Sequence, residues 1–145
     1  MVKDEQSALK ASFERALEFL NAGDHVMAEK ICRRAIKEIS NSDPNIQVLL
    51  CVSLIRQGRS GSAVKRLKHA IRSFPNFAPA HEELGNALLA QNKPELAIEA
   101  FKKALQIKPD NPSPMIKLGK IYNKLGRKDE SNELYQKALS LEPTK

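Results

Sequence analysis

A spacing of 34 residues dominates this sequence. Residues 78–111 place small, apolar and proline residues at Leu84, Gly85, Leu88, Ala97, Phe101, Ala104 and Pro109. Adding 34 to each number gives Leu118, Gly119, Tyr122, Ser131, Tyr135, Ala138 and Pro143, and subtracting 34 gives Leu50, Cys51, Leu54, Ala63, Leu67, Ala70 and Pro75. A fixed period of this length is typical of stacked repeat arrays. The chain is therefore expected to fold as similar units that pack on their neighbours.

Each unit has the pattern of two helices joined by a turn. Gly85 and Leu88 share one face of a first helix, because their spacing matches 3.6 residues per turn. Ala97 and Ala104 share one face of a second helix by the same rule. We expect the small Gly85 to meet these two alanines, so that the helix backbones approach closely. Pro109 cannot continue a helix interior and marks the end of the unit.

These residues resemble the tetratricopeptide repeat family, in which a repeat is a helical hairpin. The resemblance implies an all-α fold, a right-handed superhelix of about four hairpins. The repeats would span about 9–43, 44–77, 78–111 and 112–145 of a single domain, 1–145. Residues 1–8 are expected to be a short frayed lead-in. Asp43 and Pro44 have the residue types of an N-cap and a first helical position.

Length and composition favour a protein without a targeting or membrane segment. The polar N-terminus has no apolar run, and no stretch approaches the roughly 18 apolar residues of a membrane span. Cys32 and Cys51 fall at core positions, without the paired spacing of a zinc site. We therefore expect reduced buried thiols, no bound metal and a cytoplasmic protein.

No catalytic arrangement is apparent in the sequence. His25, His69 and His81 belong to different repeats, and no motif places a nucleophile, a base and an orienting group together. Phosphate-binding and dinucleotide-binding glycine motifs are also missing from the sequence. The chain is therefore expected to be a binding protein and not an enzyme, with no cofactor and no small-molecule substrate.

The resemblance also indicates which side chains face a partner. In the family, positions 2, 5, 9, 12 and 13 of each first helix line a concave groove. The first two repeats supply an apolar set: Phe13, Leu17, Leu20, Val48, Val52 and Ile55. The last two supply a polar, partly basic set: Glu82, Asn86, Leu89, Lys120, Asn123 and Lys124. The hypothesis is a peptide-binding groove, and the alternative is that Phe13 and Val48 pack between repeats.

The sequence argues against one known use of such a groove, the binding of a peptide C-terminus. Some family members hold a peptide C-terminus in a two-carboxylate clamp that needs Lys at position 5 and Asn at position 9 of one first helix. The pairs here are Phe13 with Leu17, Val48 with Val52, Glu82 with Asn86 and Ile116 with Lys120. None matches that pair.

The positive charge of the chain is concentrated in one repeat. The net charge is +7, and residues 44–77 contain no Asp or Glu. Their second helix carries Lys65, Lys68 and Arg72 on one face. The basic outer patch is defined as Arg59, Lys65, Arg66, Lys68 and Arg72. It is a hypothetical docking site for an acidic protein segment or nucleic acid, and the alternative is a solvated helix face.

The last repeat ends without a capping helix, which repeat arrays usually need. Three readings stay open: the chain is a piece of a longer protein, it dimerises through this end, or its last helix is polar enough alone, as Ser131, Asn132 and Gln136 suggest. We expect a protein-interaction scaffold that binds a peptide or helical segment. The alternatives are a helical accessory region of a longer enzyme, such as a transferase, and, disfavoured, a nucleic-acid-binding helical repeat. The sequence does not identify the partner.

Overall fold

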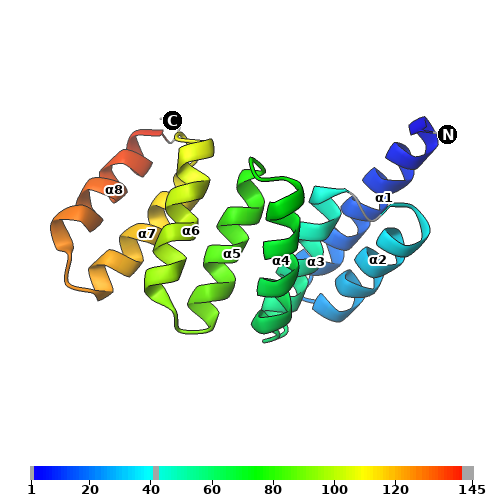
Figure 1. Ribbon diagram of the computed structural model, residues 1–145, viewed down its shortest axis with the longest axis horizontal. Coiled ribbons are helices and arrows are strands. Elements are labelled where there is room, and N and C mark those ends of the chain that lie inside the picture. Colours follow the sequence, from blue (N-terminus) through cyan, green and yellow to red (C-terminus); the bar gives the residue numbers. More distant parts are fainter. Residues whose placement is uncertain (1, 41–42, 142–145) are drawn as a thin grey trace. The chain divides into compact units, whose positions relative to one another are not determined.

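Helical hairpins make up the part of the chain that the computed structural model describes, residues 2–40 and 43–141. The helices are α1 (Val2–Asn21), α2 (His25–Glu38), α3 (Pro44–Arg56), α4 (Ser60–Ser73), α5 (Ala78–Ala90), α6 (Pro94–Ile107), α7 (Pro112–Lys124) and α8 (Lys128–Leu141). Consecutive helices pack as the hairpins α1–α2, α3–α4, α5–α6 and α7–α8 (Figure 1). Since these described residues form no strand, the predicted all-α fold of four helical hairpins is confirmed.

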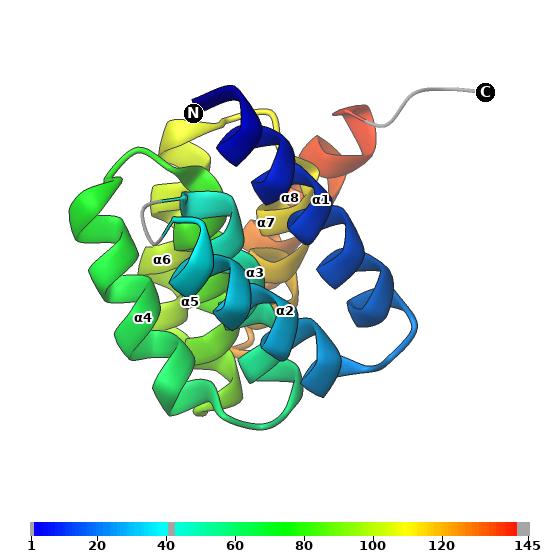
Figure 2. The ribbon, with the colours of Figure 1, turned by 90° about the vertical axis from the view of Figure 1, so that its right-hand side faces the viewer.

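The hairpins are grouped in two compact units, residues 1–75 and 76–145. In the first unit α2 packs against both α1 and α3, and α1 also contacts α3 (Figures 1 and 2). In the second unit α6 packs against α5 and α7, and α7 packs against α8. The assignment of residues 1–145 to a single domain stays a prediction.

The N-terminus is more regular than the expected frayed lead-in. Helix α1 begins at Val2 and runs for 20 residues, whereas the repeat was expected to begin near Leu9. Residues 2–10 contain no Gly or Pro, and Asp4 and Glu5 lie in the first turn, where carboxylates favour the helix dipole. The local propensity therefore extends the helix one and a half turns or more beyond the repeat pattern.

The close approach inside the third hairpin involves an aromatic ring. A Cβ atom placed on Gly85 would lie 2.7 Å from the ring atoms Cε1 and Cζ of Phe101, which are its nearest neighbours. Ala97 and Ala104, the expected neighbours, flank Phe101 on the same buried face of α6. The prediction of a tight contact at Gly85 was right, but its nearest neighbour is the large Phe101 and not the small alanines.

The fourth hairpin repeats this contact at Gly119. A Cβ atom there would lie 2.7 Å from Cε1 of Tyr135. Ser131 is buried at 2% exposure and donates a hydrogen bond of 2.7 Å from its Oγ to the carbonyl oxygen of Gly119. Ser131 therefore does not make the outer surface of α8 polar, as the sequence had suggested, although Asn132 and Gln136 are exposed.

Turns and caps set the helix limits. Each hairpin turn places one residue in the left-handed region, with φ of +88° at Gly23, +79° at Gly58 and Gly126, and +60° at Asn92. The third turn uses asparagine because its side chain tolerates this conformation better than other non-glycine residues do. Asp43 accepts a hydrogen bond of 2.9 Å from the backbone N–H of Ile46, which confirms the predicted N-cap of α3.

Candidate functional site

The predicted apolar set in the first unit is only partly accessible. Leu20 and Val48 are 3% and 8% exposed, so they offer almost no surface to a partner. Their burial fits the direct packing of α1 against α3. Leu17 is 36% exposed, and the remaining three are half-buried: Phe13, Val52 and Ile55. The accessible apolar surface is therefore smaller than the sequence suggested.

The predicted polar set in the second unit borders a cavity of about 510 Å³. Lys120, Asn123 and Lys124 of α7 line it, and all three are exposed. Its other lining residues are mostly apolar: Leu89, Asn92, Pro94, Lys117, Ile121, Leu125 and Tyr135. The structure thus places three lysines and two asparagine amides beside apolar side chains in a single unit.

Two other members of the polar set are already engaged. Glu82 accepts hydrogen bonds from the Oγ of Ser113 at 2.5 Å and the Nζ of Lys117 at 2.8 Å, which joins α5 to α7. The side-chain amide of Asn86 donates to Glu83 at 3.0 Å. Glu82 is therefore a contact between hairpins, and the accessible cations of this set are Lys120 and Lys124.

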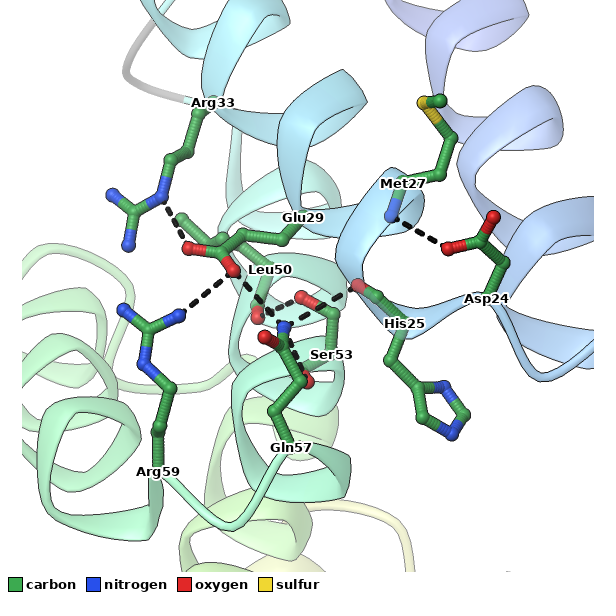
Figure 3. A network of polar contacts seen from close by, with 9 residues as sticks. All are labelled: Asp24, His25, Met27, Glu29, Arg33, Leu50, Ser53, Gln57 and Arg59. Atoms are coloured by element: carbon green, nitrogen blue, oxygen red, sulfur yellow. Dashed lines mark hydrogen bonds and ion pairs between the residues drawn. The ribbon is translucent and has the colours of Figure 1, made fainter.

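A network around Glu29 was not anticipated from the sequence (Figure 3). Glu29 of α2 is 9% exposed and accepts from Arg33 at 2.6 Å, from Arg59 at 2.8 Å and from Gln57 at 3.0 Å. The Nε2 of Gln57 also lies 3.3 Å from the carbonyl oxygen of His25 and 3.1 Å from that of Ser53. The network joins the first hairpin to the second.

The electrostatics of Glu29 favour its charged form. Burial alone would raise its pKa, but the hydrogen bonds from Gln57 and Arg33 and the charges of Arg33 and Arg59 outweigh burial, so the pKa is lowered. No sequence motif pairs Glu29 with Arg59, because the two are 30 residues apart and meet only when α2 packs on the next hairpin.

The network changes the predicted basic patch. Arg59 was expected to carry charge with no acid to offset it, and this is wrong because Arg59 pairs with Glu29. The other four residues of the basic outer patch lie on α4, where Lys65, Lys68 and Arg72 are exposed and Arg66 is half-buried. These four cations form no ion pair among the described residues, so they are the part of the patch whose charge is not offset.

The cysteines lie in the core. Cys32 and Cys51 are buried, and neither forms a disulfide. Burial, and next the negative charge of Glu29, raise the pKa of Cys32 to about 12. In the described residues no three His, Cys, Asp or Glu side chains gather in a way that could hold a metal ion.

Helical hairpins that recur every 34 residues define a helical-repeat protein. Two tetratricopeptide repeat family models match the chain, over residues 51–112 and 88–144. The small glutamine-rich tetratricopeptide repeat-containing protein 2 of Saccharomyces cerevisiae is 33% identical in an alignment 104 residues long, which covers 66% of this chain and 29% of that protein. The chain belongs to the tetratricopeptide repeat family.

Solved structures share the fold. A structure of MamA superposes with a TM-score of 0.75 at 20% identity, covering 97% of this chain and 85% of that one. The structure of an O-GlcNAc transferase mutant from Thermobaculum terrenum superposes with a TM-score of 0.75 at 27% identity, and the match covers 81% of this chain and 22% of that one. The chain spans between 6% and 29% of the length of the first three curated relatives that it matches.

Among the described helices, none has the length and apolar character to cross a membrane.

Proposed function

We propose that this chain is a protein-interaction scaffold that binds a peptide or a helical segment of a partner. The observation that supports this most directly is the cavity beside α7, where Lys120, Asn123 and Lys124 surround an apolar floor. Binding sites commonly combine a largely apolar surface with a few polar groups that fix orientation. The lysines suit a partner segment that presents carboxylates or backbone carbonyls next to an apolar side chain.

The first unit adds apolar surface to the proposal. Phe13, Leu17, Val52 and Ile55 retain accessible area on α1 and α3. The family membership supports a binding role, because tetratricopeptide repeats generally serve as non-catalytic scaffolds. The cytoplasmic location and the absence of catalysis are parts of this proposal.

Phage display tests whether the cavity binds peptides. A library of random short peptides is selected for binding to the 145-residue chain. The double replacement Lys120→Gln and Lys124→Gln should lower the affinity for the selected peptides by about fivefold or more, because each exposed ion pair contributes up to about 1 kcal/mol. The matched control is Lys103→Gln with Lys128→Gln, two exposed lysines outside the cavity. Equal losses in both double variants would contradict the site.

The apolar surface has its own test. The double replacement Val52→Ala and Ile55→Ala should leave the circular dichroism spectrum helical and should weaken the binding of peptides to the first unit. Loss of the folded state would assign both residues to the core. Retention of the fold with unchanged binding would remove the first unit from the proposed site.

A second candidate is a helical accessory region of a longer enzyme. It is favoured by the likeness to the O-GlcNAc transferase structure, of which this chain covers 22%. An antibody raised against this chain, followed by mass measurement of the captured native protein, separates the two. A mass well above that of 145 residues, with transferase activity in the captured protein, would favour this second candidate.

A further inference from the structure

The exposed face of α4 carries cations without acidic partners. Lys65, Lys68 and Arg72 are exposed, His69 lies beside them, and Arg66 is half-buried at the edge. Over residues 4–40 and 43–141, none of these lysines and arginines forms an ion pair. At 100° per residue these five side chains follow one another around the solvent side of the helix. The face is thus a continuous basic band.

Three acidic groups of the first unit are already engaged by other partners. Glu29 is held by Gln57 and two arginines, Glu38 pairs with Arg34 at 3.0 Å, and Asp43 caps α3. Residues 44–77 contain no Asp or Glu. Among the described residues of the first unit, the lysines and arginines of the band therefore have no ion-pair partner.

A cavity of about 370 Å³ lies at one edge of the band. Ile36 of α2, Ala70 and Phe74 give it an apolar floor, and Arg66 and His69 border it. All of these residues belong to the first unit. An apolar side chain can enter this cavity while charged neighbours in the same segment reach the cations of α4.

We propose that the basic band of α4 and this cavity together form a docking site for an acidic protein segment with a leucine or aromatic side chain as its anchor. Charge complementarity selects the acidic segment, and the apolar floor selects the anchor. A nucleic acid fits less well, because binding of single strands generally uses several exposed aromatic faces. Of the two rings that line the cavity, Phe74 is half-buried and only the imidazole of His69 is exposed. This site uses α4 and is separate from the cavity beside α7.

Fluorescence anisotropy with two synthetic peptides tests the proposal. Both peptides alternate Glu and Ser, and the central residue is Leu in one and Ser in the other. The Leu peptide should bind more tightly, and its affinity should fall as salt is raised. Lys65→Gln, Lys68→Gln and Arg72→Gln combined should weaken both peptides by about tenfold, as three exposed charge contacts are lost.

The matched control combines Lys103→Gln, Lys108→Gln and Lys128→Gln, which removes the same charge from exposed positions of the second unit. It should change the affinity by less than about twofold. Ser73→Trp, at the exposed edge of the cavity, should abolish the preference for Leu over Ser and keep the salt-dependent binding. Thermal melts followed by circular dichroism confirm that each variant is folded.

Several results would overturn the proposal. Equal binding by parent and triple variant would exclude the band, and a preference for Leu that survives Ser73→Trp would exclude the cavity. Tighter binding of a polyuridine RNA than of either peptide would assign the face to nucleic acid. A parent that sediments as a dimer and a triple variant that sediments as a monomer would make a second copy the occupant.

Discussion

At the scale of single residues, a glycine in the first helix of a hairpin faces an aromatic ring in the second helix. Gly85 lies against Phe101, which is fully buried, and Gly119 lies against Tyr135, which is half-buried. A buried ring has no free space into which it can shift, whereas a half-buried ring can move toward solvent. The two glycines therefore differ in how well they tolerate a methyl group.

Gly85→Ala should lower the free energy of unfolding by about 1–3 kcal/mol, because the new Cβ overpacks the ring of Phe101. Gly119→Ala should cost less, since Tyr135 can yield. Urea titrations of both variants measure the difference. A second replacement, Phe101→Leu, should cost less in the Gly85→Ala background than in the parent. Additive costs would contradict direct contact between the two positions.

The thiol of Cys32 should be inert in the folded protein. Its pKa of about 12 keeps it protonated at neutral pH, and the thiolate is the reactive form. Ellman's reagent should therefore detect almost no thiol in the native chain at pH 8, and both cysteines after denaturation in guanidinium. Rapid labelling of native Cys32, identified by peptide mass spectrometry, would show that α2 opens readily.

At the scale of helices and hairpins, Glu29 stabilises the packing of the first hairpin on the second. Because its pKa is lowered in the folded state, its contribution is complete above the ordinary value of 4.5 and is lost as the pH falls through the lower folded value. Glu29→Gln should therefore lower the melting temperature most near neutral pH, and less as the pH falls from about 5 to 3. A difference that does not depend on pH would mean that the charge of Glu29 contributes nothing.

The helices were predictable because local signals agree with the repeat. The 34-residue period, the capping residue Asp43 and the turn glycines all mark the same limits that the structure has. The third turn was less evident, because Asn92 takes the place of glycine. The repeat pattern does not predict the early start of α1, because that pattern begins near Leu9, whereas the helix propensity of residues 2–8 extends the helix toward the N-terminus.

The candidate sites were less predictable, because accessibility depends on contacts between hairpins. Leu20 and Val48 have the position of groove residues but are buried, in helices that pack on α2 and on each other. Arg59 belongs by sequence to the basic repeat but is paired with Glu29. A helical wheel assigns a face to each residue and cannot tell which face a neighbouring hairpin covers.

At the scale of the whole molecule, the two compact units should respond separately to a local change. The Glu29 network lies wholly within residues 1–75. In repeat proteins stability is approximately a sum of terms for each repeat and for nearest neighbours. Hydrogen exchange followed by mass spectrometry should therefore show faster exchange of α2, α3 and α4 in Glu29→Gln, with α7 and α8 unchanged. Equal acceleration throughout would indicate one cooperative unit.

The pairing of Gly85 with Phe101 also limits how such repeats can be recombined. Consider a chimera that joins the first helix of residues 44–77 to the second helix of residues 78–111. Cys51 would then replace Gly85, and its side chain would collide with the ring of Phe101. Exchange of a whole hairpin would preserve the contact between Gly85 and Phe101, whereas this exchange of single helices would disrupt it.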